Sequence, residues 1–298
     1  MHNKKGTDLP NANMKYIVAN PTGNITILVT TDVPQSERLA VVREMFEKEP
    51  TCEQVGFISV LGPKRIRLEM MGGEFCGNAT MSAAAYLASL NAGEQNDEAG
   101  EKTAVKIGDA TTITVEASGA DEPVEVEIIR NAEVASADGK IEKSFTGTLE
   151  MPMPELGSIE YKNADGASIQ SPIVHLDGIS HMIVPVEGAK TGGESNSDSY
   201  KTEMESSIKS IADEIGVPAL GMIRYESLGS DVAIEPLVYV KGSDTLVWEN
   251  GCASGSIAAA FYRYKTEGAA ETAVRNPGGV LKVAIEDGKL FITGTVKL

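Results

Sequence analysis

The chain is short of cysteine, of positive charge and of long apolar runs, and each shortage excludes a class of protein. Three cysteines in 298 residues cannot form the disulfide framework of a small secreted scaffold. The 26 basic side chains are outnumbered by 43 acidic ones, and the net charge of −17 argues against nucleic acid, whose phosphates need clustered Lys and Arg. No apolar run reaches the length of a membrane span. We therefore expect neither a nucleic-acid partner nor a membrane.

A signal peptide is also lacking, since the first residues have no apolar core. Residues 1–13 are instead predicted to form a disordered leader. We expect a cytoplasmic protein, because a reducing compartment would keep its cysteines as thiols. With 298 residues, 42% of them hydrophobic, the chain exceeds the usual size of one core and is expected to form two domains.

The chain contains one motif in two near-copies. The first copy, GGEFCGNATMSAAAYLASL, covers Gly72–Leu90, and the second, ENGCASGSIAAAFYRY, covers Glu249–Tyr264. Aligning Cys76 with Cys252 also superposes two alanines and a tyrosine. The two cysteines lie 176 residues apart (252 minus 76), which is too far for one local motif. They are therefore predicted to occupy equivalent positions in two halves of a duplicated fold, and to offer two thiols to one ligand from opposite sides.

Each cysteine is predicted to stand at the N-terminus of a helix. A short turn of small residues follows it, and apolar residues then recur at helical spacing. Free N–H groups and the positive end of the helix dipole favour an anion there, and the same field would lower the pKa of the thiol. The alternative is a pair of buried structural cysteines ahead of two alanine-rich core helices. Two matched copies favour the functional interpretation.

The remaining pattern predicts strands in pairs with one peripheral helix in each half. Asp32-Val33-Pro34-Gln35 resembles a capping box, and the helix after it is expected to bury Leu39, Val42, Met45 and Phe46. The Pro-rich stretch Met151–Gly157 is predicted to cross between domains, and Asp287-Gly288 to form the turn of a final hairpin.

The predicted fold class is α/β (α+β), with two pseudo-symmetric domains. Each is expected to be a mainly antiparallel sheet or barrel around the helix that follows its cysteine. The N-terminal domain is expected to span residues 14–150 together with the C-terminal strand 290–298, and the C-terminal domain to span 151–289.

These motifs resemble the diaminopimelate epimerase family, which includes cofactor-independent amino-acid racemases. The CGN that starts at Cys76 is similar to the family's first thiol motif, and the CASG that starts at Cys252 is similar to its second, with alanine where the family usually has glycine. Asn24 matches an asparagine of the family's N-terminal Gly-Asn turn, and His181 lies where the epimerases have Gly-Asn-Pro-His. The resemblance extends over about Met14–Leu298 and also implies the two-domain epimerase fold.

The pairing of thiols predicts an isomerase that inverts an α-carbon by two-base proton transfer. One cysteine, as thiolate, would remove the α-proton, and the other, as thiol, would protonate the opposite face. N–H groups at the two helix N-termini would stabilise the charge on the substrate carboxylate, with no cofactor and no metal. The catalytic candidates are Cys76 and Cys252, and the substrate-binding candidates are Asn24, Glu74, Gly77, Asn78, His181, Glu249, Ala253, Ser254 and Gly255.

Departures from the family pattern bear on the substrate. Ser243-Asp244-Thr245 stands where diaminopimelate epimerases have Glu-Arg-Gly, and Arg67, Ile179 and Ile223 stand where asparagines are expected. The two thiol motifs are kept, whereas the residues for the distal end of the substrate differ. In this combination the chain resembles the histidine racemase branch of the family. We expect a substrate with one α-centre, such as histidine, and keep diaminopimelate epimerase as the alternative.

Other interpretations remain open at this point. An isomerase of the same fold that uses carboxylates is one, and a non-catalytic redox or metal-binding protein is another. His175 and His181 do not have the spacing of a known zinc site. Glu74 and Glu249 either bind the substrate ammonium or are surface carboxylates. Cys52 lacks the motif and is expected to be a bystander, and a homodimer is compatible with the sequence.

Overall fold

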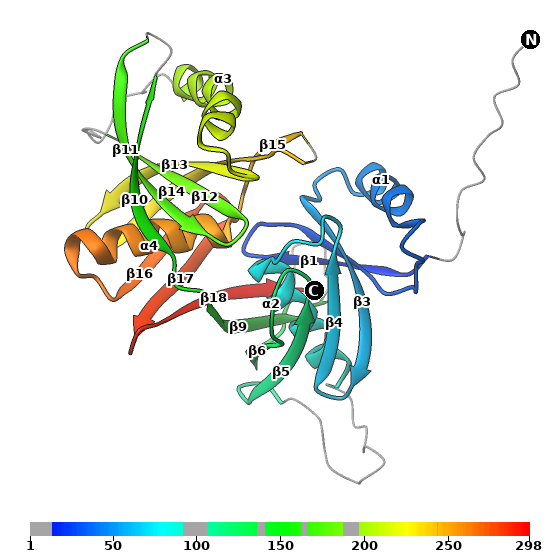
Figure 1. Ribbon diagram of the computed structural model, residues 1–298. Helices are drawn as coiled ribbons and strands as arrows, with labels where there is room; N and C mark the ends of the chain where they lie inside the picture. The colour runs from blue at the N-terminus through cyan, green and yellow to red at the C-terminus, as the bar shows by residue number, and fades with distance from the viewer. Residues whose placement is uncertain (1–13, 92–105, 136–140, 163–165, 187–196, 243) are drawn as a thin grey trace, which may run out of the picture.

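Two lobes make up the protein, and the strands β9 (Ser144–Met151) and β18 (Lys289–Lys297) run between them (Figure 1). The computed structural model describes residues 14–91, 106–135, 141–162, 166–186, 197–242 and 244–298. The leader predicted for residues 1–13 lies outside this part of the chain. No helix among the described residues is long and apolar enough to cross a membrane.

The first lobe is a closed barrel in the order β1-β2-β3-β4-β5-β6-β9-β18, closed because β18 pairs with both β9 and β1. Its other strands are β1 (Tyr16–Pro21), β2 (Thr26–Val29), β3 (Gln54–Gly62), β4 (Arg65–Met70), β5 (Ala110–Ala117) and β6 (Val124–Arg130). Inside lies α2 (Gly77–Leu90), which contacts all of these strands. A short ribbon, β7 (Val134–Ala135) with β8 (Ile141–Glu142), stands apart. The predicted barrel around the first thiol-led helix is confirmed.

In the second lobe seven strands wrap around α4 (Ala253–Glu267) in the order β17-β16-β14-β13-β12-β11-β10. Among the described strands this path ends at β10, and β15 (Thr245–Trp248) pairs with β14. The strands are β10 (Glu155–Lys162), β11 (Ser168–Leu176), β12 (Ile179–Pro185), β13 (Ala219–Leu228), β14 (Asp231–Val240), β16 (Glu271–Asn276) and β17 (Gly279–Glu286).

The same sequence of pairings occurs in both lobes, which confirms the pseudo-symmetry. From β1 to β6 the neighbours are antiparallel, parallel, antiparallel, parallel and antiparallel, and from β11 to β17 the order is the same. Each parallel pair needs a crossover, and the crossovers contain α1 (Arg38–Lys48) and α2 in one lobe and α3 (Ser197–Ile215) and α4 in the other. A domain boundary at Met151 stays a prediction.

The first peripheral helix begins later than the sequence indicated. Its N-cap is Glu37, without a side-chain cap bond, so the expected capping by Asp32 is wrong. The buried face contains Val41 and Met45, which pack against β2 and β3, whereas Leu39 is 64% exposed. Residues between Asp32 and the helix form an irregular turn instead, and this shift moves Leu39 to the solvent side.

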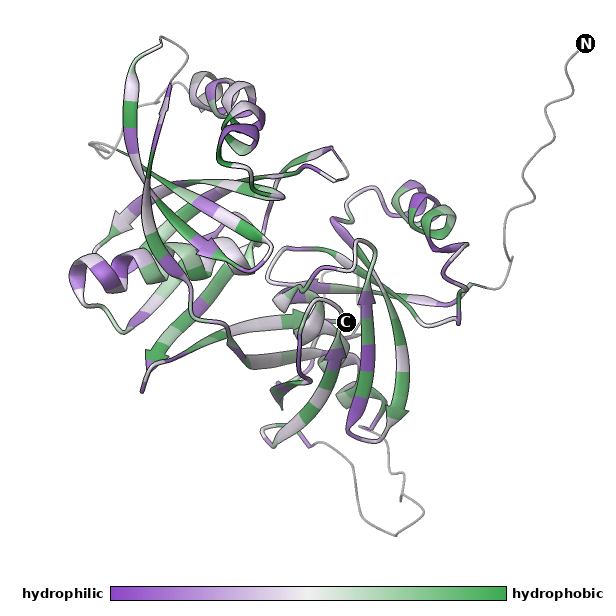
Figure 2. Cartoon of the chain, viewed as in Figure 1, coloured by the Kyte–Doolittle hydropathy of each residue, from purple (hydrophilic) through white to green (hydrophobic). Residues whose placement is uncertain are grey.

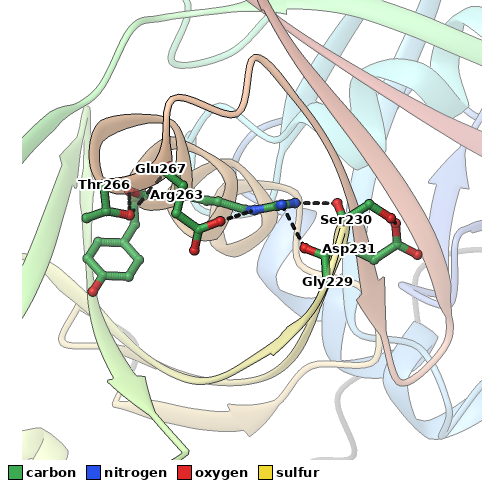
Figure 3. Close-up of polar contacts among 7 residues, drawn as sticks. Gly229, Ser230, Asp231, Arg263, Thr266 and Glu267 are labelled. Atoms are coloured by element: carbon green, nitrogen blue, oxygen red, sulfur yellow. Dashed lines mark hydrogen bonds and ion pairs between the residues drawn. The ribbon is translucent and has the colours of Figure 1, made fainter.

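Helix α4 is apolar where it begins and hydrophilic where it ends (Figure 2). Near its end the buried Arg263 donates to the carbonyls of Gly229 and Ser230, and its Nε lies 2.9 Å from Glu267 (Figure 3). These carbonyls belong to the turn between β13 and β14, so the guanidinium ties the helix to the sheet that surrounds it. Because its donors are satisfied, the charge can be buried.

We predict that Arg263→Met lowers the free energy of unfolding by about 1.5–3 kcal/mol, because charged hydrogen bonds are lost while the apolar stem is kept. Chemical denaturation checks this, with Lys265→Met on the exposed side of the same helix as the control, expected to change stability by about 0.5 kcal/mol or less. Equal losses in the two variants would contradict an anchoring role for Arg263.

Candidate active site

The two motif cysteines are the N-cap residues of the two central helices. Cys76 precedes α2 and Cys252 precedes α4, both with extended backbone. Each sulfur accepts an N–H from the residue three positions on, from Ala79 at 3.5 Å and from Gly255 at 3.2 Å. The predicted helix starts are therefore confirmed, and the two copies share one local geometry.

These two turns meet at the interface of the lobes. A Cβ on Gly77 would lie 3.6 Å from the Cβ of Ala253, so the first residues of α2 and α4 are in contact. Across the same interface, the Asn78 amide donates to the carbonyl of Gly251 at 2.8 Å. Gly251 itself has no room for a side chain, because a Cβ would collide with the carbonyl oxygen of Thr22. The fold thus brings together two helix N-termini that are distant in sequence.

A half-buried carboxylate bridges the lobes beside this contact. Glu53 accepts from the amide of Asn24 in the first lobe at 2.6 Å and from that of Asn250 in the second at 2.9 Å. Burial raises the pKa of Glu53, and the amide bonds lower it in part. Asn24 is fully buried, so here it supports Glu53 in the wall of the site rather than facing a ligand.

The Cys76 thiol donates to the side-chain oxygen of Gln54 at 2.9 Å. The residue keeps some exposed surface, but the surrounding protein desolvates its sulfur, which raises the pKa of Cys76 to about 12. The charges of Glu74 and Glu249 raise it further, while N–H groups of the first helical turn lower it. Glu74 is exposed on the approach to this thiol.

The carboxylate of Glu249 interacts with the second thiol. Burial, and then the charge of Glu249, raise the pKa of Cys252 well above its usual range. Burial likewise raises the pKa of Glu249 to about 7, an effect that the interaction with Cys252 opposes and the charge of Glu53 reinforces. The expectation that the helix N-termini would lower both thiol pKa values is therefore wrong, because desolvation outweighs the N–H donors. Both cysteines are therefore thiols at neutral pH in the free protein.

His181 is fully buried behind the second thiol. Its Nε2 lies 2.9 Å from the hydroxyl oxygen of Ser254, which is in turn 3.5 Å from the sulfur of Cys252. Burial lowers the pKa of His181 to about 3, so the ring is neutral. Gly221 is needed beside it, because a Cβ there would collide with Nδ1. His181 thus orients Ser254 instead of meeting a ligand directly.

Free backbone donors remain at the interface. The N–H groups of Gly77, Ala253 and Ser254 have no acceptor in the described part of the chain. They lie at the first turns of α2 and α4, and free N–H groups at helix N-termini favour an anion. Beside these turns, a hollow of about 530 Å³ opens on the outer face of β13 and β14 and includes Glu249 in its wall. Among the described residues, no group of His, Cys, Asp or Glu is clustered enough to hold a metal ion.

Sequence reasoning missed Glu53, Gln54, Asn250 and Asn276. The amide oxygen of Asn276 accepts the N–H of Cys252 at 3.0 Å, and Asn250 lies inside the second motif at the position where the first copy has Glu74. Gln54 is the first residue of β3 and Glu53 directly precedes it, so both lie outside the two motifs. Nothing local distinguishes them from other polar residues at strand ends, so only the assembled fold identifies them.

One thiol-led helix in each half of a duplicated barrel fold defines the class: an amino-acid racemase or epimerase of the diaminopimelate epimerase fold. The fold is also that of a solved structure described as a predicted epimerase from Pseudomonas aeruginosa. The two superpose with a TM-score of 0.59 at 14% identity, over 96% of this chain and 97% of the other.

The comparison of sequences gives the family. Residues 13–296 match the family model described as the histidine racemase CntK N-terminal domain. A histidine racemase of Fusobacterium nucleatum subsp. nucleatum is 30% identical over 96% of this chain and 94% of its own length. A histidine racemase of Staphylococcus aureus is 26% identical over 89% and 85%, respectively. The chain therefore belongs to the histidine racemase family, and it is an isomerase.

We predict that the neutral state of His181 makes stability fall with acid. The pKa is depressed from 6.5 to about 3 on folding, so below about pH 6.5 the unfolded chain binds the extra proton. Between about pH 6.5 and pH 5 this costs about 2 kcal/mol. Urea titrations of the wild type and His181→Gln at both pH values measure it. The difference between the two proteins should shrink by that amount at the lower pH, and a constant difference would contradict the assignment.

Proposed function

We propose that the protein racemises histidine in a reducing cytoplasm, without a cofactor, by proton transfer between Cys76 and Cys252. The observation that carries this proposal is the meeting of two helix N-termini, each led by a cysteine whose thiol is desolvated. The relatives named histidine racemases, at 30% and 26% identity, support the substrate.

In the proposed complex the α-carbon lies between the two sulfurs. The carboxylate binds the N–H groups of Gly77, Ala253 and Ser254, and the ammonium approaches Glu249. One thiolate removes the α-proton, and the electron pair moves onto the carboxylate, where the helix N-termini stabilise it. The opposite thiol then protonates the other face, and the two cysteines have exchanged roles.

In the second lobe, Glu249 generates the thiolate of Cys252. Its carboxylate accepts the Cys252 proton, and its position in the wall of the hollow lets that proton exchange with solvent. The bound ammonium adds positive charge, which favours the thiolate over the thiol. Gln54 accepts the S–H of Cys76 and so keeps that thiol in one orientation while it waits as the acid.

A substrate with a single α-centre fits better than diaminopimelate. Ile223 is fully buried in the core, and Asp244 lies on the surface, bonded to Lys209 and Tyr239. Neither position offers a partner for a second amino-acid end. Leaving such a charged end unpaired would cost several kcal/mol, roughly. The oligomeric state, for which a homodimer is compatible, stays a prediction.

We predict that Cys76→Ser and Cys252→Ser each lower the rate of histidine racemisation by about 10²- to 10⁴-fold, because a hydroxyl cannot supply the thiolate. Racemisation is followed by chiral chromatography, and α-hydrogen exchange by NMR in deuterium oxide. Each variant keeps one acid-base group, so each is expected to exchange the α-hydrogen of one enantiomer only.

Cys52→Ser is the control, since its thiol bonds to the backbone carbonyl of Gln54 and lies outside both motifs. It is expected to keep most of the activity. A wild-type protein that exchanges no α-hydrogen from any amino acid would instead support a redox or binding function, and faster turnover of diaminopimelate than of histidine would overturn the substrate assignment alone.

Glu249→Gln tests the generation of the thiolate. With the pKa of Glu249 at about 7, the proton acceptor is lost as the pH falls through neutrality. The wild type should therefore lose kcat/KM on the acid side of pH 7, whereas the variant should be slower throughout and lack that limb. Profiles from about pH 5.5 to pH 9 measure this, and an unchanged acid limb in the variant would assign it to another group.

A further inference from the structure

Asn276, the last residue of β16, is 6% exposed and lies against the second thiol turn. Its Oδ1 accepts the N–H of Cys252 at 3.0 Å. Its Nδ2 donates to the hydroxyl of Ser256 at 2.9 Å and to the carbonyl of Val274 at 3.3 Å. One side chain thus joins the N-cap residue and the first turn of α4 to strand β16.

This bond also determines which donors face the substrate. The first N–H groups of an α-helix have no partner inside the helix. Asn276 takes the N–H of Cys252, and the sulfur of Cys252 takes that of Gly255. The N–H groups of Ala253 and Ser254 are left for the substrate carboxylate. A rotation of the turn would misplace these two donors and the sulfur together.

The turn after Asn276 holds the chain on the other side of the thiol. The N–H of Gly278 donates to the carbonyl of Asn250 at 2.7 Å. Residues 276–278 therefore form hydrogen bonds with the chain at Asn250, before the thiol, and at Cys252 itself. The position of the sulfur depends on this turn, which neither copy of the cysteine motif contains.

The first lobe offers a matched control at the equivalent place. Ser118 directly follows β5, the strand that corresponds to β16 in the order of pairings. Its hydroxyl accepts the N–H of Met70 at 2.9 Å and donates to the carbonyl of Glu74 at 3.0 Å. These bonds support the segment ahead of Cys76 but do not reach Cys76 itself.

We propose that Asn276 is a positioning residue that holds Cys252 in line with one face of the substrate α-carbon, an inference that rests on the proposed function. For one enantiomer the Cys76 thiolate breaks the C–H bond, and an S–H bond forms while the electron pair moves onto the carboxylate. Cys252 must then break its own S–H bond to form the new C–H bond on the opposite face. When Cys252 is displaced, Cys76 exchanges its proton with solvent and returns it to the original face.

Asn276→Leu and Asn276→Asp test this in deuterium oxide, starting separately from L- and D-histidine. The leucine variant is expected to invert histidine about 10- to 100-fold more slowly, the range that a small misplacement of a reacting group produces. In the leucine variant, deuterium should replace the α-hydrogen without inversion in one enantiomer of histidine only. Cys252→Ser should show this exchange with the same enantiomer. The aspartate variant keeps the acceptor for the Cys252 N–H, so its asymmetry should be in the same sense and smaller.

Ser118→Ala removes a comparable bond from the other lobe and should not produce this asymmetry. Thermal melting followed by circular dichroism identifies the variants that are folded. If the leucine variant does not fold, Asn276→Asp provides the test. The inference is overturned if folded Asn276 variants keep the wild-type ratio of exchange to inversion for both enantiomers, or if they behave like Ser118→Ala. Racemisation by the wild type would still stand in that case. A wild-type protein without α-hydrogen exchange overturns the proposed function and the inference with it.

Discussion

Two backbone segments from different lobes touch without a side chain between them, and the site depends on this contact. A Cβ on Gly23 would lie 2.5 Å from the Cα of Gly278, and one on Gly251 would meet the carbonyl of Thr22. The turn between β1 and β2 therefore rests directly on the chain that leads to Cys252. Any side chain at these glycines would push the lobes apart and separate the two thiols. The Asn24–Glu53–Asn250 bridge closes the same interface with hydrogen bonds.

Burial brings the two thiols into a desolvated site, but it also opposes the formation of a thiolate there. It raises the pKa of both thiols and of Glu249, so in the free protein both sulfurs keep their protons. The helix N-termini act against this, but their donors are too few to prevail over desolvation. In the proposed complex the ammonium of a zwitterionic substrate supplies what is missing, because its positive charge offsets the carboxylates that raise the thiol pKa values. In the proposed mechanism the reactive thiolate is therefore formed only when the substrate is bound.

The sequence predicts those features that depend only on residues close together in the chain. Asp287 and Gly288 have φ values of 50° and 76°, as the two-residue hairpin turn requires, and both cysteines cap the helices that follow them. Asp32 failed as a cap because a capping pattern says nothing about where tertiary packing starts the helix. Glu53 and Asn276 could not be found, since each reaches its partner only after distant segments have folded together. The thiol pKa values failed for the same reason, because the extent of burial is a property of the assembled lobes.

The two lobes hold their thiols by different means, and topology explains why. The first barrel is closed by β18, so α2 is packed against strands on every side and its N-terminus is fixed by the core. Among the strands that the structure describes, the path of the second sheet ends at β10, and α4 has polar anchors at both of its ends. Arg263 ties its last turns to the β13–β14 turn, and Asn276 ties its first turn to β16. In the proposed mechanism both thiols must be held equally firmly if protonation is to keep pace with deprotonation. Hydrogen bonds in the second lobe would then supply the restraint that closure of the barrel supplies in the first.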